Sequence, residues 1–439
     1  MVAPPFLVSA PGKTILFGEH AAVYGKPAIA AALSLRSFLL VSPHTTADDA
    51  GTVRLEFPDI NLQYAWKIDS LPWSRVPKHA PDSIRPSSEL HSDLIEALEA
   101  PLAEVYSPLQ RTAALAFLYL YMSLCVAEKP EVTFSVRSTL PIGAGLGSSA
   151  SISVCISAAL CLLSGEVAPP EGPYANGGLN TVDLANIELI DAWAFLGERC
   201  MHGNPSGIDN AVASHGGAVM FQRMMKGNPN VRENMRDFPE LKLLLVDTKQ
   251  PRRTAVQVAN VAALHESFPK VTEPILESIK ELTDEAYGML RMPKTKCDEP
   301  WAARMRELVR INHGLLVALG VSHPKLELIR CATDELEIGE TKLTGAGGGG
   351  CAITLVKESV TAEKLVELRK RLEGHGFALF ETSLGGPGAG ILMPCSENAA
   401  EWEDWEEKLF SVHHLLALES REHVEEAIGV NSNKGWAFW

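Results

Sequence analysis

Apolar and polar residues alternate along 132–138, where Val132, Phe134 and Val136 share one side of the segment. A period of two residues is typical of a half-buried strand. Glycines and serines follow, and the run of small and apolar residues at 149–163 predicts a buried helix. The pattern therefore predicts a strand, a glycine loop and a helix N-terminus in succession.

Similar patterns predict elements on both sides of this unit. The strands do not alternate regularly with helices, which indicates an α+β fold. Helical spacing predicts helices at about 90–105, 109–127, 183–202, within 260–338 and at 361–374. Alternating or continuous apolar runs predict strands at 52–57, 62–68, 241–248 and 377–386, with a glycine-turn hairpin at 342–356.

The buried strand at 241–248 opens a second unit, so we expect two domains, 1–236 and 237–439. The loop 71–88 is rich in proline and serine and is long for a compact domain, which indicates a lid or an insert. The acidic tail from 396 carries large apolar residues along one helical face, at Trp402, Trp405, Leu409, Val412 and Leu416. We expect a helix that packs on the second domain rather than a dimer contact.

Composition limits the functional classes. With 439 residues and 46% hydrophobic content, the chain can bury more than one core. Its formal net charge of −15 argues against nucleic acid and anionic membrane surfaces as partners. The first residues lack a signal-peptide pattern, and no apolar run is long enough for membrane insertion, so we expect a cytoplasmic protein. The eight cysteines form no CxxC pair, which favours reduced thiols over disulfides or a structural metal.

The glycine loop is the first candidate for chemistry. Gly143, Gly145 and Gly147 occupy every second position before Ser148 and Ser149. A strand, a glycine loop and a helix start direct unpaired N–H groups and the helix dipole at one point, which suits an anion. The spacing matches neither the dinucleotide fingerprint nor the Walker loop. The alternative is a glycine turn that only packs tightly on the helix.

Three other segments accompany this loop, "PIGAGLGSSA" at 141–150: "PGKTILFGEH" at 11–20, "HGNPSGIDN" at 202–210 and "KLTGAGGGGCAI" at 342–353. Together the four segments resemble the GHMP kinases, the galacto-, homoserine, mevalonate and phosphomevalonate kinases, over about residues 6–394. The resemblance implies a ribosomal-protein-like N-terminal domain and a ferredoxin-like C-terminal domain with the site between them.

The resemblance also implies phosphoryl transfer from ATP, with Mg²⁺, to a hydroxyl of a small molecule. The segments are most similar to those of the members that phosphorylate the 5-hydroxyl of (R)-mevalonate in isoprenoid synthesis. Two alternatives stay open: a related kinase with phosphomevalonate or a sugar as acceptor, and a ligand sensor that has lost its chemistry. Family membership also allows a homodimer and inhibition by prenyl diphosphates.

By this resemblance, ATP binds at Pro141, Gly143, Ala144, Gly145, Leu146, Gly147, Ser148, Ser149 and Ala150. Ser149 or Ser148, together with Glu198, matches the family's Mg²⁺ ligands. A hydroxyl and a carboxylate are ligands that Mg²⁺ accepts beside phosphates. The alternative roles are a helix cap for the serines and an ion-paired surface for Glu198.

Asp209 matches the catalytic aspartate of the family, and Lys13 matches its partner. A lysine about 4 Å from an oxyanion contributes about 4 kcal/mol at an effective dielectric near 20. A carboxylate beside a lysine is a weak base toward an alcohol, so Asp209 is expected to orient the hydroxyl and accept its proton late. An ordinary helix cap is the alternative for Asp209.

Glu19, His20 and Thr248 fall where the family contacts its acceptor, although a His–Glu pair can also be structural. Arg252 or Arg253 is a candidate for the acceptor carboxylate, or a solvated loop charge. The glycines at 345–350 form either a flexible turn or a turn that closes over the phosphates. No metal role is expected for His202, His215 or His313.

Overall fold

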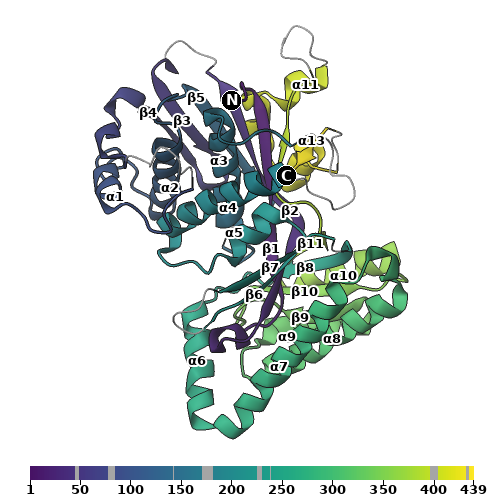
Figure 1. Ribbon diagram of the computed structural model, residues 1–439. Coiled ribbons are helices and arrows are strands. Elements are labelled where there is room, and N and C mark those ends of the chain that lie inside the picture. The colour runs from purple at the N-terminus through teal and green to yellow at the C-terminus, as the bar shows by residue number, and fades with distance from the viewer. Residues whose placement is uncertain are drawn as a thin grey trace.

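The computed structural model describes residues 1–44, 49–77, 85–141, 143–170, 181–224, 230–237, 239–395, 404–431 and 435–439. One long antiparallel hairpin, β1 (Phe6–Phe17) and β2 (Ala28–Pro43), runs through both halves of the molecule (Figure 1). Strand β5 (Val132–Ser138) pairs with one end of β2, and strand β6 (Ala218–Gln222) pairs with the other end. The hairpin is therefore common to both domains.

The first domain confirms the strand, loop and helix predicted around residue 140. Its sheet contains β5, the predicted hairpin β3 (Thr52–Phe57) and β4 (Leu62–Lys67), and the pair β6 and β7 (Val231–Met235). Its helices are α1 (Ser92–Leu98), α2 (Pro108–Leu124), α3 (Ser148–Ser164), α4 (Thr181–His202) and α5 (Ile208–His215). Only α1 is clearly shorter than the predicted 90–105, because residues after Leu98 form turns.

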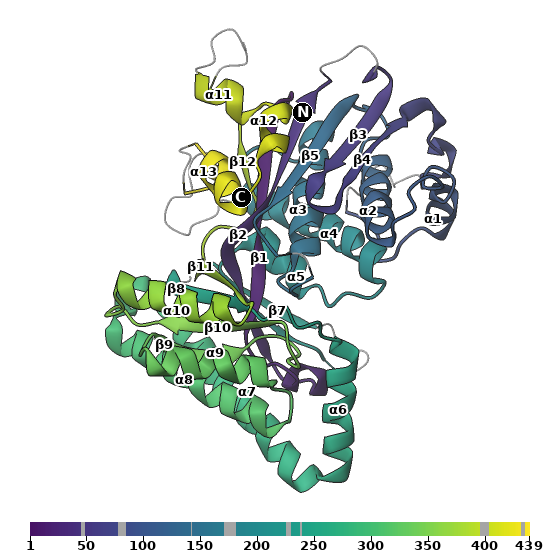
Figure 2. The same cartoon turned by 180° about the vertical axis from the view of Figure 1, so that it is seen from behind.

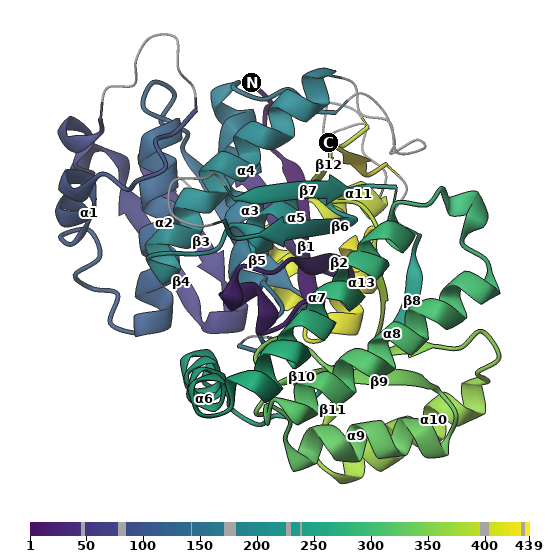
Figure 3. The same ribbon diagram turned by 60° about the horizontal axis from the view of Figure 1, so that its bottom comes forward.

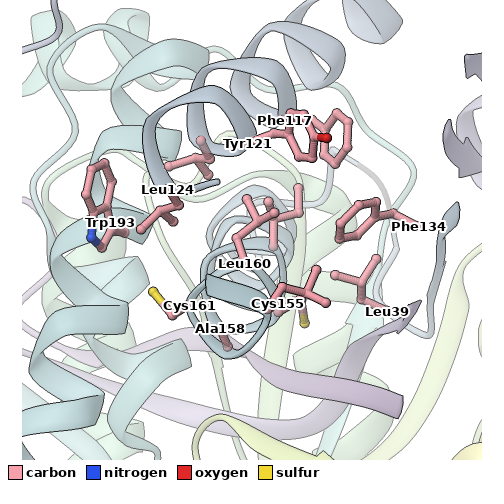
Figure 4. Packing of buried hydrophobic residues seen from close by; sticks show 14 of the residues in the cluster. Leu39, Phe117, Tyr121, Leu124, Phe134, Cys155, Ala158, Leu160, Cys161 and Trp193 are labelled. Atoms are coloured by element: carbon pink, nitrogen blue, oxygen red, sulfur yellow. The ribbon is translucent and has the colours of Figure 1, made fainter. Parts of the chain in front are cut away.

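Helix α3 lies at the centre of the first core (Figure 4). Leu160 and Cys155 of α3 pack with Phe117 of α2, Trp193 of α4 and Phe134 of β5, and all five are buried. The apolar run predicted from 149–163 thus contacts neighbours on several sides of the helix. This core holds the start of α3, and with it the glycine loop, in a fixed position.

The second domain has an antiparallel sheet in the order β11 (Ala378–Leu384), β8 (Leu241–Asp247), β10 (Cys351–Val356) and β9 (Gly339–Leu343). Numbered along the chain, this order is 4-1-3-2, that of a ferredoxin-like sheet. Helices α7, α8 and α9 lie together beside it (Figure 3). The helices are α6 (Thr254–Ser267), α7 (Pro269–Leu290), α8 (Glu299–Ala318), α9 (Pro324–Glu335) and α10 (Ala362–Gly374). The expected two-domain α+β architecture is confirmed.

The position expected for the tail is wrong. Helices α11 (Asp404–Leu409), α12 (Val412–Ala417) and α13 (Arg421–Ile428) replace one long helix and lie on the first domain (Figure 2). Their apolar residues Leu409, Leu415 and Val424 pack against Leu7, Phe38 and Leu40 of β1 and β2. Those strand residues point away from α3 because side chains alternate along a strand, so the sheet needs cover on both faces.

The end of the chain returns to the same domain. Strand β12 (Gly390–Leu392) pairs with β1, and β13 (Ala437–Phe438) pairs with β12. Trp402 and residues 78–84 of the predicted lid lie outside the described residues. The boundary that we propose at 236–237 falls between β7 and β8, but the chain beyond β11 belongs spatially to the first domain.

None of the helices in the described part of the chain combines the length and the apolarity that a membrane crossing needs. Six cysteines carry free thiols, namely Cys125, Cys155, Cys161, Cys200, Cys331 and Cys351.

We predict that Leu160→Ala lowers the free energy of unfolding by about 2–5 kcal/mol, because it leaves a cavity in the first core. Leu184→Ala, on the adjoining helix α4, removes a side chain that is 45% exposed and serves as the control. Chemical denaturation of both variants measures the difference. Equal losses would contradict the central position of α3.

Candidate active site

The glycine loop connects β5 to α3. Gly143, Gly145 and Gly147 adopt left-handed backbone angles, with φ of 75°, 77° and 71°, which glycine reaches at no steric cost. Gly143 and Gly145 are exposed. The first N–H groups of α3 have no acceptor within the helix. The loop therefore offers backbone donors and the positive end of the helix dipole to a ligand.

Lys13 lies in a bulge of β1 directly beside this loop, and its N–H donates to the carbonyl of Leu146 at 2.8 Å. A Cβ at Gly147 would lie 2.9 Å from Cγ of Lys13, so glycine makes the close approach of the lysine feasible. Lys13 Nζ is 3.1 Å from Oδ1 of Asp209, in the first turn of α5. The structure brings together the two residues expected to be catalytic.

Glu198 of α4 faces the same region and is 3% exposed. Burial, assisted by the charge of Asp209, raises the pKa of Glu198 to about 7, although Ser149 and Lys13 oppose the shift. Its Oε1 has no hydrogen-bond partner among the described residues. A buried carboxylate oxygen without a partner is costly unless a cation meets it. Ser149 and Glu198 are therefore the residues that would hold a Mg²⁺ ion here, since a hydroxyl and a carboxylate are oxygen ligands that this ion accepts.

A cavity of about 260 Å³ opens beside Lys13 and Asp209. Glu19 and His20 line it, as expected from the sequence. Thr254, at the start of α6, also lines it and was missed. The segment "DTKQPRRT" contains two threonines, and only the path of the chain after β8 decides which one reaches the cavity.

Thr248, the threonine selected from the sequence, does not reach this cavity. It is 1% exposed, its hydroxyl donates to the carbonyl of Gly350 at 2.7 Å, and it accepts from the N–H of Gln250 at 3.2 Å. These contacts connect the end of β8 to the glycine turn at 345–350. Thr248 therefore stabilises the glycine turn and does not line the cavity.

Arg252 joins the glycine loop to the glycine turn. Its guanidinium donates to the carbonyls of Ala144 at 3.2 Å and Thr344 at 2.9 Å. A Cβ at Gly145 would lie 1.7 Å from Nη2 of Arg252. The glycine turn of the second domain thus lies close to the glycine loop of the first domain, the candidate phosphate-binding loop. The neighbouring Arg253 is exposed.

An apolar cavity that the sequence did not reveal adjoins Ser148 and Ser149. Its walls come from β3, the turn after β3, α2, β5, α3 and the end of α4, and include Leu55, Phe57, Ile60, Leu109 and Ile152. These residues are far apart in the sequence, so no local pattern could have predicted their meeting. The cavity is suited to a flat apolar group placed next to the glycine loop.

Glu188, Asp191 and His215 bring three metal-ligating atoms close together in the first domain. Arg232 already forms ion pairs with both carboxylates. Burial and nearby arginines lower the pKa of His215 to about 3. The positive charge of Arg232 makes this cluster a poor cation site.

His202 and His313 have other partners. His202 Nε2 lies 3.1 Å from Oγ of Ser149, and His313 Nε2 lies 3.1 Å from Oε1 of Glu327. Of these two, only His202 is next to a candidate metal ligand.

Comparison with known proteins agrees with this geometry. The GHMP kinases N terminal domain matches residues 111–217, and the GHMP kinases C terminal domain matches residues 301–374. Mevalonate kinase of Candida albicans is 49% identical over 99% of this chain and 99% of its own. Mevalonate kinase of Homo sapiens is 39% identical over 89% of this chain and 96% of its own.

Solved structures show the same fold. Mevalonate kinase of Methanococcus jannaschii aligns with a TM-score of 0.60 at 23% identity, covering 88% of this chain and 99% of that one. L. major mevalonate kinase, solved in complex with R-mevalonate, aligns with a TM-score of 0.59 at 21% identity, covering 88% of this chain and 97% of that one. With relatives up to 49% identical along nearly its whole length, the chain belongs to the GHMP kinase family.

Proposed function

We propose that the chain transfers the terminal phosphoryl group of ATP to the 5-hydroxyl of (R)-mevalonate, an early step of isoprenoid synthesis. The observation that carries this proposal is the Lys13–Asp209 pair, which lies between the glycine loop and a cavity of small-molecule size. Relatives with mevalonate kinase activity in their names support the choice of acceptor. The proposal includes a cytoplasmic location, and family membership allows a homodimer.

Each of the two cavities binds one of the two substrates. The apolar cavity beside Ser148 and Ser149 suits the adenine ring, and the glycine loop suits the phosphates that follow it. The acceptor then occupies the cavity at Lys13, Asp209 and Thr254. This arrangement points the terminal phosphoryl group at the acceptor hydroxyl.

Lys13 and Asp209 supply the chemistry of this chain. Asp209 orients the hydroxyl by accepting its hydrogen bond and takes the proton as the bond to phosphorus forms. Lys13 keeps a positive charge beside both the carboxylate and the transferring group, where it offsets charge in the transition state. Its low exposure, 9% of the side chain, strengthens this interaction.

Ser149 and Glu198 would hold Mg²⁺ against the phosphates. The ion would supply neutralisation of phosphate charge. The side chains fix its place because Glu198 is buried on α4 and Ser149 lies in the first turn of α3. The carboxylate of Glu198 also gains the partner that its buried Oε1 lacks.

A coupled assay of ADP release tests the proposal directly. The purified chain with Mg-ATP is offered mevalonate, phosphomevalonate, galactose and homoserine in parallel. We expect turnover with mevalonate well above that with the other three. Turnover with another acceptor would identify a different kinase of the family, and no turnover at all would favour a ligand sensor.

We predict that Asp209→Asn lowers kcat by about 10²–10⁴-fold, the range for losing a positioned proton acceptor. The amide keeps the shape of the side chain, so the affinity for ATP, measured by titration calorimetry, is expected to change little. A variant that keeps most of kcat would remove Asp209 from the mechanism.

Glu198→Gln is expected to raise the Mg²⁺ concentration needed for half-maximal rate by about tenfold or more, since a neutral amide is a weaker ligand than a carboxylate. The same change removes a buried charge, so the thermal stability of the ligand-free protein at pH 8 is expected to be equal or higher. Magnesium titrations and melting curves measure the two effects. An unchanged Mg²⁺ requirement would argue against this ligand.

The two threonines of "DTKQPRRT" form a matched pair of variants. Thr254→Val is expected to raise KM for mevalonate several-fold, because one donor on the cavity wall is lost. Thr248→Val removes a buried hydrogen bond outside the cavity lining and is expected to lower the melting temperature instead. The opposite assignment of the two effects would restore Thr248 as the acceptor contact.

A further inference from the structure

Glu19 is a buried carboxylate in the segment that joins β1 to β2. The residue is 3% exposed and lines the acceptor cavity. A carboxylate in this position requires partners, because an unpaired buried charge is strongly unfavourable. Both of its partners come from the second domain.

Lys342 of β9 forms an ion pair with Oε1 of Glu19, and Asn312 of α8 donates from Nδ2 to Oε2 at 3.0 Å. Lys342 and Asn312 are both 0% exposed. Burial lowers the pKa of Lys342, whereas Glu19 raises it. Glu19 is therefore the acid that pairs with this buried lysine at the domain interface.

The segment next to Glu19 is held in the same way. His20 has a φ of 62°, which is unusual for a residue with a side chain. Its Nε2 lies 2.9 Å from the carbonyl of Ala346 in the glycine turn. Ala346 lines the same cavity as Glu19 and His20, so contacts across the domain interface set this cavity wall.

Stability alone does not account for a buried ion pair in this place. Replacing such a pair by apolar side chains of similar volume is often neutral or stabilising, whereas removal of one partner leaves an unpaired charge. What the pair does provide is a fixed position for the carboxylate. An ionised carboxylate has about four acceptor sites, and Lys342 and Asn312 use one on each oxygen.

We propose that Lys342 is a positioning residue for the acceptor: with Asn312 it holds the Glu19 carboxylate in place on the cavity wall, where a hydroxyl of the acceptor donates to it. The negative charge of Glu19 disfavours the carboxylate end of an acceptor at this wall. The inference rests on the proposed function and adds the orientation of the bound acceptor, with a hydroxyl toward Glu19 and the carboxylate end away from it.

Three variants of the full chain test this role. Lys342→Met removes the charge and keeps most of the side-chain length. The double variant Glu19→Gln, Lys342→Met removes both charges and leaves no unpaired one. Lys26→Met is the matched control, because Lys26 follows Glu19 by seven positions and pairs with Glu277 of α7 at 2.5 Å outside the cavity.

We expect Lys342→Met to lower the melting temperature and to raise KM for mevalonate by about tenfold or more, with KM for ATP unchanged. In the double variant the melting temperature is expected to return close to that of the wild type, while KM for mevalonate stays raised. Lys26→Met is expected to keep the wild-type KM for both substrates.

Recovery of KM together with the melting temperature in the double variant would overturn the proposal, because the pair would then be purely structural. Equal rises of both KM values would overturn it as well. If Lys342→Met does not fold, the double variant decides alone, since it contains no unpaired buried charge. A wild-type protein that does not phosphorylate mevalonate would instead refute the proposed function.

Discussion

The close contact of a lysine with a glycine loop organises this molecule. Gly147 has no side chain to crowd Cγ of Lys13, and the lysine reaches Asp209 beside it. The same glycine is the N-cap residue of α3 and has left-handed backbone angles. One position therefore affects both the start of the helix and the location of the Lys13 ammonium group. A buried ammonium group between a carboxylate and a loop of backbone N–H donors can bind and stabilise the negative charge of a phosphate group.

The long hairpin of β1 and β2 makes this arrangement a property of both domains (Figure 1). It carries Lys13 beside the first-domain loop and Glu19 into the second domain, where Lys342 and Asn312 meet it. Arg252 adds a further link between the glycine loop and the glycine turn. The acceptor cavity thus depends on the relative position of two separately packed cores.

Most local structure was predictable because it follows from short-range patterns. The strand at 132–138 and the helix after the glycine loop agree with the structure to within a residue or so. The tail was assigned to the wrong domain, because a helical pattern reveals which face is apolar but not which surface it covers. In the structure, Phe38 and Leu40 on the far face of β2 require that cover.

The sequence by itself determined the glycine loop, the family motifs and the residue types that suit phosphoryl transfer, since these depend on spacing within a few residues. Tertiary structure decided that Thr254 rather than Thr248 reaches the cavity, and that Glu19 is paired with Lys342. It also assembled the apolar cavity beside Ser149 from six separate elements. Such contacts join residues hundreds of positions apart, and their geometry follows from how the sheets and helices pack, which no local pattern encodes.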